Sequence, residues 1–197
     1  MKKSSLLAVC LILLLACEKT ETQKKVLIMG RGQVVAKGND ITMKDGNSYV
    51  EETVEIKEDK PVTWNITTPT GKTTVNIPGE KGFYLLNLKT DTIVGSQQNM
   101  GDLGGRTMTQ EELRSKIDSL VKLTSGANVK PGGNNFFILP NQLAKISSST
   151  NAILVGPFNK IPGSIDADKN GNAPEIFKFY TNTGLRELIG NLKKNTY

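Results

Sequence analysis

The side chains best suited to chemistry in this chain are the oxygen donors gathered between residues 166 and 175. Asp166, Asp168 and Asn170 occupy alternate positions, and a glycine follows directly. Oxygens at the first, third and fifth positions of such a segment can converge on one cation, because the glycine permits a tight turn and the carbonyl of the seventh position adds a ligand. Ca²⁺ prefers ligands of this kind. The candidate metal ligands are Asp166, Asp168, Asn170, Asn172 and Glu175.

The same segment resembles the first half of the calcium-binding loop of EF-hand proteins, and the resemblance implies a structural Ca²⁺. The twelfth position of an EF-hand loop carries a bidentate glutamate. Phe177 stands at that position here, and Glu175 comes two residues too early. Asn, Asp and Gly also favour polar turns for local backbone reasons. We therefore interpret the segment as a polar turn without a cofactor, and keep calcium binding as the alternative.

Other catalytic chemistry is restricted by composition, since the chain contains no histidine. This excludes Ser-His-Asp and Cys-His triads and zinc or iron sites with histidine ligands. A Ser-Lys pair is conceivable between the serine-rich residues 147–150 and Lys145, but such a nucleophile requires a buried, deprotonated lysine. A flexible serine loop supplies no burial, so we predict no catalytic residues and no enzymatic activity.

Residues 1–17, MKKSSLLAVCLILLLAC, combine a basic start, a short apolar run and a final cysteine. The apolar run from Leu6 to Leu15 is shorter than the roughly 18–20 residues that a membrane-spanning helix needs. This combination is typical of a cleaved export signal. The ending Leu14-Leu15-Ala16-Cys17 resembles the lipobox of bacterial lipoproteins. The resemblance implies a signal peptide over residues 1–16 and a diacylglyceryl group on the Cys17 thiol.

The lipobox resemblance has further implications for location. Lipoproteins of this kind carry two or three acyl chains, such as palmitate, and two chains already give stable anchoring to a membrane. In many Gram-negative lipoproteins an Asp after the cysteine signals retention in the inner membrane, whereas Glu18 stands here. We therefore expect the outer membrane, on either its periplasmic or its surface face. Because Cys10 leaves with the signal peptide and Cys17 is acylated, neither a thiol nor a disulfide is expected.

The charge of the chain is mildly positive. The formal net charge is +6, and loss of Lys2 and Lys3 with the signal peptide lowers it by two. Lys and Glu are interspersed, whereas a nucleic-acid binder clusters its basic residues on one face. We therefore predict no nucleic-acid partner. The expected partners are the membrane, through the lipid anchor, and an envelope protein or glycan.

Two short sequences resemble the O-glycosylation acceptor sequence of some Gram-negative exported proteins. They are Asp91-Thr92-Ile93 and Asp118-Ser119-Leu120. Thr92 and Ser119 are therefore candidate glycosylation sites.

The N-terminal half has the pattern of β-strands. Residues 62–66 alternate between apolar and polar side chains, which predicts a strand with one buried face. Residues 69–72 (PTGK) predict a turn and residues 75–77 resume the alternation, so we expect a hairpin. The dense apolar run over residues 83–88 predicts a strand buried on both sides. The glycines at the ends of residues 30–32 (GRG) predict another turn.

The C-terminal half mixes helix and strand signals. Thr109 and Glu112 form a capping box that predicts the start of a helix, and Gly126 predicts its end. A final helix is expected after Thr183 as N-cap, with Lys193 and Lys194 at its C-terminal end. A short helix is expected around residues 141–146. Buried strands are expected at residues 136–139, 152–155 and 176–180.

These patterns predict an α+β fold, in which an N-terminal antiparallel sheet or small sandwich precedes a mixed α/β half. The predicted divisions are a lipidated tether (17–24), a β-rich domain (25–95), a Gly-rich linker or loop (96–108) and an α/β domain (109–197). A single α+β domain is the alternative. For function, we predict a lipid-anchored envelope lipoprotein with a non-enzymatic binding or structural role. The alternative is a calcium-dependent binding protein, or a carboxylate- or metal-dependent hydrolase that uses residues 166–170.

Overall fold

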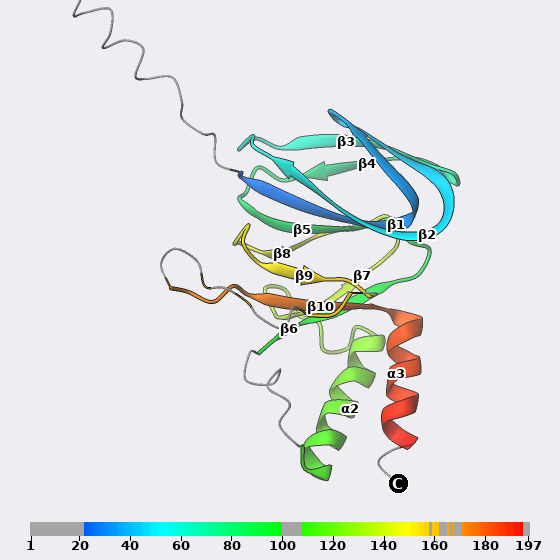
Figure 1. Ribbon diagram of the computed structural model, residues 1–197, viewed down its shortest axis with the longest axis vertical. Coiled ribbons are helices and arrows are strands. Elements are labelled where there is room, and N and C mark those ends of the chain that lie inside the picture. Colours follow the sequence, from blue (N-terminus) through cyan, green and yellow to red (C-terminus); the bar gives the residue numbers. More distant parts are fainter. Residues whose placement is uncertain are drawn as a thin grey trace, which may run out of the picture.

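The computed structural model of the chain describes residues 22–99, 108–157, 159–161, 165, 167 and 171–194. These residues form ten strands and two helices. In chain order they are β1 (Lys24–Lys37), β2 (Asp40–Ile56), β3 (Val62–Thr68), β4 (Gly71–Ile77), β5 (Gly82–Asn87), β6 (Ile93–Gln98), α2 (Gln110–Thr124), β7 (Asn135–Ile138), β8 (Leu143–Ser147), β9 (Ile153–Val155), β10 (Ile176–Thr181) and α3 (Asn182–Lys194). Figure 1 shows three layers: a six-stranded sheet, a four-stranded sheet and the helix pair.

The six-stranded sheet has the order β4-β3-β2-β1-β5-β8. β1 and β2 form a long antiparallel hairpin, which runs from the pair Lys24–Ile56 to the pair Lys37–Asp40. β3 and β4 form a second hairpin, which confirms the prediction from alternation and turn residues. The contacts of β1 with β5 and of β2 with β3 are parallel. The sheet is therefore mixed, where an antiparallel sheet was expected.

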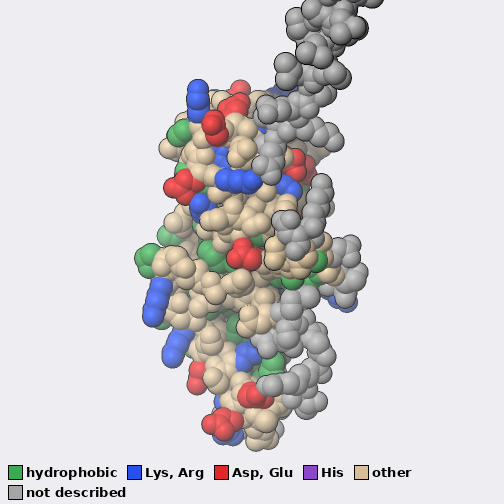
Figure 2. All heavy atoms as spheres, turned by 90° about the vertical axis from the view of Figure 1, so that its left-hand side faces the viewer, with side chains coloured by type: hydrophobic (Ala, Val, Ile, Leu, Met, Phe, Trp, Pro, Cys, Tyr) green, Lys and Arg blue, Asp and Glu red, His purple; other side chains and the backbone are tan. Residues whose placement is uncertain are grey.

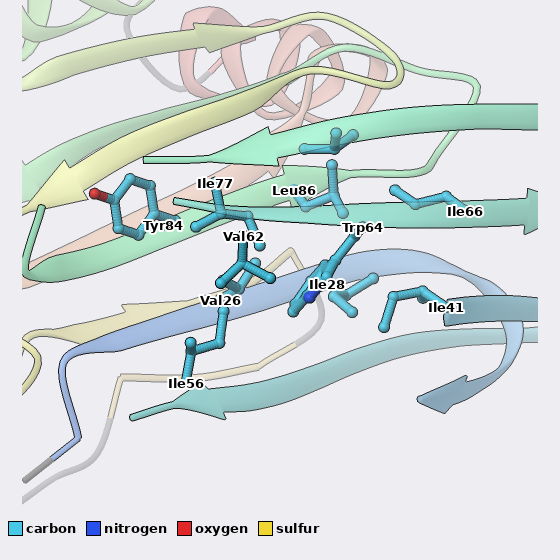
Figure 3. Packing of buried hydrophobic residues seen from close by; sticks show 11 residues of the cluster. Val26, Ile28, Ile41, Ile56, Val62, Trp64, Ile66, Ile77, Tyr84 and Leu86 are labelled. Atoms are coloured by element: carbon cyan, nitrogen blue, oxygen red, sulfur yellow. The ribbon is translucent and has the colours of Figure 1, made fainter. Parts of the chain in front are cut away.

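The six-stranded sheet curls around one of its own faces. Strands β1 to β5 all contribute to a single apolar cluster, seen from close by in Figure 3, in which the Trp64 side chain is 1% exposed. Ile77 from the edge strand β4 and Tyr84 from β5 belong to this same cluster, although three strands separate β4 and β5 in the sheet. Burial of apolar surface, at roughly 25 cal/mol per Å², is the main stabilising contribution of such a core.

β5 and the first half of β1 are buried on both faces. Successive side chains of a strand point to opposite faces, so Leu27 and Leu85 leave the first core and pack with Ile93 and Phe179 of the second sheet. That sheet has the order β7-β6-β10-β9. All residues of β5 are buried, which confirms the prediction of a doubly buried strand over this apolar run.

The two helices pack on the outer face of the four-stranded sheet. Ile117 of α2 and Leu185 and Ile189 of α3 form a third cluster with Val94 of β6. The helices lie at the opposite end of the molecule from the six-stranded sheet in Figure 1. Among the described residues, neither helix is long and apolar enough to cross a membrane.

One of the two predicted helix starts is correct. At α2 the Glu112 N–H donates to the Thr109 hydroxyl over 3.2 Å, and the Thr109 N–H donates to the Glu112 carboxylate over 2.9 Å. The capping box is thereby confirmed. The prediction of Thr183 as N-cap of the final helix is wrong, because α3 begins one residue earlier. The Thr183 N–H donates instead to the carboxylate of Asp91, over 3.1 Å.

Both sheets contain strands from both sides of the predicted linker. β8 completes the six-stranded sheet beside β5, and β6 lies between β7 and β10 in the other sheet. Residues 96–98, expected in the linker, belong to β6, and the short helix expected around 141–146 is wrong because β8 occupies this region. With ten strands and two helices, the described fold is richer in β-structure than the α+β prediction implied.

Candidate functional site

Four segments, three connections between strands and the bent middle of the β1–β2 hairpin, meet at one end of the six-stranded sheet and line a pocket of about 290 Å³. They are the bend of the β1–β2 hairpin, the β3–β4 turn, the loop after β5 and the β7–β8 turn, all on the right-hand side of Figure 1. Loops held on a rigid scaffold are the usual location of binding residues. We name it the Lys89 pocket and define it by Arg31, Asp45, Tyr49, Thr70, Lys89 and Asn141.

A β-bulge bends the hairpin at this pocket. Arg31 and Tyr49 are paired across β1 and β2, and the register shifts directly after Arg31. Gly32 has a φ of +106°, and a Cβ there would lie 1.9 Å from the carbonyl oxygen of Lys44. Only glycine therefore fits this position, and the bulge increases the local twist of the hairpin. The turn predicted at residues 30–32 is in fact a bulge within a continuous strand.

A fully buried asparagine, Asn87, fixes two of these four segments. Its side-chain amide donates to the carbonyl oxygens of Asp91 and Ile138, each over 3.0 Å, and its side-chain oxygen accepts the Lys89 N–H over 2.9 Å. Its main-chain oxygen accepts the Asn141 N–H over 2.7 Å. Both donors of the amide are used and the oxygen has a partner. Asn87 therefore holds the loop after β5 and the β7–β8 turn in one arrangement.

The ammonium group of Lys89 is the most buried charge of the pocket. The residue is 6% exposed, and its Nζ lies 4.2 Å from the centroid of the Tyr49 ring, a cation–π distance. Burial lowers the pKa of Lys89, while the carboxylates of Glu51 and Asp91 oppose this shift. Desolvation favours the neutral form of a lysine and a nearby negative charge favours its ammonium form. The protonation state of Lys89 therefore depends on the negative charges in its surroundings.

Glu51 joins the Lys89 pocket to the second sheet. A Cβ on Gly156 would lie 2.0 Å from Glu51 Oε1, so the glycine leaves the space that this carboxylate fills. Asn159 donates its side-chain amide to Glu51 Oε2. Lys178 donates to the Gly156 carbonyl over 2.7 Å, and burial lowers its pKa while Glu51 opposes the shift. One carboxylate therefore acts on two ammonium groups, those of the buried Lys89 and the half-buried Lys178.

A larger hollow, of about 880 Å³, lies between β7 and β8. These consecutive strands belong to different sheets, so the arms of their connection diverge and the hollow opens between them. We name it the β7–β8 cleft and define it by Phe136, Lys145, Ser147, Glu175 and Phe177. Phe136 and Phe177 lie edge to face with their ring centroids 5.8 Å apart.

The polar side chains of the β7–β8 cleft already have partners. Ser147 is 6% exposed; its hydroxyl donates to the Glu175 carboxylate and accepts the Ser149 N–H over 2.9 Å. Lys145 forms an ion pair with Glu80 over 2.7 Å, and this contact lowers the pKa of the Glu80 carboxyl. The serine therefore has a glutamate as its partner, in place of the lysine that the Ser-Lys option required.

The candidate residues from the sequence fall in different parts of the molecule. Cys17, Asp166, Asp168 and Asn170 lie outside the described residues. Of the other candidate calcium ligands, Asn172 is exposed, and the Glu175 carboxylate accepts a hydrogen bond from the Ser147 hydroxyl. Within the described part of the chain, no three His, Cys, Asp or Glu side chains are placed to hold a metal ion.

The two candidate glycosylation residues differ in exposure. Thr92 is half-buried, and its carbonyl accepts the N–H of Asn182, the first residue of α3, over 2.8 Å. Ser119 is exposed on α2. Glycosylation at either residue remains a prediction.

Sequence reasoning did not find Arg31, Asn87 and Lys89. One signal was present, because Asn87 is a polar residue within the dense apolar run FYLLNL. A buried polar side chain must be hydrogen-bonded, so an asparagine in such a run indicates a specific partner. The identity of that partner depends on Ile138, far away in the sequence.

Comparison with known proteins gives no relative for this architecture. No known protein family, curated protein or solved structure matches the chain.

Proposed function

We propose that the protein is a lipid-anchored envelope lipoprotein whose folded body acts as a non-enzymatic binding protein, with the Lys89 pocket as its binding site. The observation that carries the binding role is the arrangement around Asn87. A buried amide with all of these contacts rigidly positions the loops of a pocket that holds charged and aromatic side chains. Support of this kind around a pocket is the usual requirement of a binding site.

The position of the pocket suits an anchored protein. Residues 18–23 alone separate the candidate lipidation residue Cys17 from the start of β1 at Lys24. β1 begins at Lys24, and its start lies on the left-hand side of Figure 1, whereas the turns that line the pocket lie on the right-hand side. An anchor at Cys17 would thus hold the Lys24 end near the lipid and leave the pocket end open to solutes.

The distribution of surface charge also supports a binding role that does not depend on the net charge of the protein. On the face shown in Figure 2, acidic and basic side chains are interspersed. Mixed charge of this kind gives little attraction for nucleic acid, which requires a concentrated basic surface. Recognition would then depend on the pocket.

The anchor is tested by acylation in bacteria that express the full chain. We expect the wild-type protein to incorporate an alkyne-labelled palmitate and to sediment with membranes, and Cys17→Ala to lose both properties. Cys10→Ala is the matched control, because it removes the other cysteine and should change neither. Labelling that persists in Cys17→Ala would refute lipidation at this residue.

The binding role is tested with the low-molecular-weight fraction of an envelope extract. We expect this fraction to raise the melting temperature of the lipidated protein in detergent, and Tyr49→Ala to reduce the rise. An unchanged melting temperature for the wild-type protein would contradict the role of a small-molecule binding protein.

A further inference from the structure

We propose that the Lys89 pocket binds a small ligand through a carboxylate or phosphate group held by Arg31 and Lys89. This inference rests on the proposed binding function and names the class of its ligand. It follows from the charges, the shape and the fixed geometry of the pocket.

The charges of the pocket favour a negative group. Arg31 and Lys89 supply two cations to its lining, and Asp45 supplies one carboxylate. Asp45 is exposed, so water screens its charge, whereas Lys89 is buried. Arg31 is also exposed, and its guanidinium makes only a long contact of 3.4 Å to the Asn47 side chain. A guanidinium offers a fork of donors that matches the geometry of a carboxylate or phosphate.

Glu51 and Asp91 influence Lys89 from outside the lining of the pocket. Each has another contact: Glu51 accepts the Asn159 amide through Oε2, and Asp91 accepts the N–H of Thr183 at the start of α3. A ligand would therefore approach Lys89 from the pocket without replacing either carboxylate.

The shape of the pocket limits the size of the ligand. A volume of about 290 Å³ lies at the lower end of ligand pockets, which hold roughly 300–1,000 Å³. The Tyr49 ring, 55% exposed beside Lys89, gives a flat apolar surface for the remainder of the ligand. Asn141, at a φ of +61°, is held in a conformation that non-glycine residues rarely adopt. Asparagine tolerates this conformation in turns, so Asn141 fits the β7–β8 turn that lines the pocket.

The experiment measures the stabilisation by simple anions. The lipidated protein in detergent is unfolded by heat and followed by the fluorescence of Trp64, the single tryptophan, which lies in the core. The probes are sodium acetate and sodium phosphate, each compared with sodium chloride at equal ionic strength. We expect acetate or phosphate to raise the melting temperature. A response to acetate alone assigns a carboxylate ligand, and a response to phosphate alone assigns a phosphate ligand.

Variants of the pocket make the test specific. We expect Arg31→Gln and Lys89→Met each to weaken the apparent affinity for the responding anion by about tenfold or more, as for loss of one charge-assisted hydrogen bond. Asp45→Asn should strengthen the affinity, since it removes the like charge. Lys116→Met, on the exposed side of α2, is the matched control and should change nothing. Arg31→Gln keeps the test valid even if Lys89→Met does not fold.

Three outcomes would overturn the inference. They are the absence of a response to both anions, an equal response in Arg31→Gln, and an equal loss in Lys116→Met. If neither anion raises the melting temperature while the envelope extract still does, the ligand class is wrong and the proposed binding function stands. If neither the anions nor the extract raises it, the binding function is contradicted as well.

Discussion

The Lys89 pocket and the β7–β8 cleft share the β7–β8 connection but are built in different ways. The pocket is the smaller of the two, and a buried asparagine with a complete set of hydrogen bonds fixes its walls. The cleft has about three times the volume, and it opens because two consecutive strands enter different sheets. Its polar contact, between Ser147 and the exposed Glu175, joins side chains near its surface. Volume alone therefore does not identify the functional site. The loss in the free energy of unfolding, when the hydrogen bonds that fix the walls are removed, is the better guide.

The most direct test of this difference is to remove the hydrogen bonds that fix the walls of the pocket. Asn87→Ala leaves three polar groups of the backbone without their partner: the buried Lys89 N–H and Ile138 carbonyl, and the half-buried Asp91 carbonyl. We expect a loss of about 3 kcal/mol or more in the free energy of unfolding, since each orphaned group costs about 1–3 kcal/mol. Urea unfolding followed by Trp64 fluorescence measures this loss.

Asn76→Ala is the matched control for this variant, because Asn76 is exposed on β4. Its free energy of unfolding should stay within about 0.5 kcal/mol of the wild type. Equal effects of the two substitutions would show that Asn87 does not organise the pocket.

The corresponding change in the cleft should cost less. Ser147→Ala removes the hydroxyl that donates to Glu175 and accepts the Ser149 N–H. Glu175 is exposed and can bind water instead, so we expect a loss of about 1 kcal/mol in the free energy of unfolding. Ser148→Ala, at the exposed neighbouring position, should have almost no effect in the same urea experiment. A loss for Ser147→Ala as large as that for Asn87→Ala would remove the distinction between the two hollows.

The smallest expected effect concerns the pH dependence of stability. Burial lowers the pKa of Lys89 below its ordinary value of 10.5, so the unfolded chain binds more protons than the folded protein in the window just below pH 10.5. Stability rises with pH wherever the unfolded state binds more protons. The contribution of Lys89 to the free energy of unfolding should therefore increase with pH in that window.

Urea unfolding at pH 8.0 and pH 9.5 tests this sign. Lys89→Met should show a smaller gain in the free energy of unfolding between the two pH values than the wild type, because it removes the lysine whose pKa burial lowers. Lys116→Met should keep the full gain. Burial also raises the pKa of Tyr84 and Tyr180 above 10.0, which acts in the opposite direction at higher pH, so the comparison stays below that range. A larger gain in Lys89→Met than in the wild type would contradict the assignment.

The sequence predicted well those features that depend on near neighbours. The capping box of Thr109 and Glu112 needs only residues three apart, and it formed as expected. The hairpin over residues 62–77 follows from alternation and a turn, and its register confirms both. The wrong helix at residues 141–146 involves a distant partner, because residues 143–147 form β8 and pair with β5. The wrong N-cap at Thr183 is a local error, because the Thr181 hydroxyl accepts the Gly184 N–H over 3.0 Å at the start of α3.

The candidate site could not be predicted from the sequence, because it depends on residues that lie far apart in the chain. The side chains that define the Lys89 pocket come from the β1–β2 hairpin and from three connections between strands, and none of these segments carries a recognisable motif. Asn87 can be recognised as unusual in an apolar run, but Lys89 looks like any surface lysine until the loop after β5 is buried. Likewise, the Glu51 carboxylate is buried only because Gly156, directly after β9, leaves space for it.

By itself the sequence determined the local elements: where most strands lie, how α2 begins and which faces are apolar. It also carries the resemblance to lipoproteins at Cys17, whose test remains an experiment. The tertiary structure alone decided that β1 pairs with β5 in parallel, that β6 pairs with β10, and that a pocket forms where the β1–β2 hairpin meets three connections between strands. Periodicity and capping act over a few residues, whereas strand pairing and burial of charge depend on the free energy of the whole packed chain.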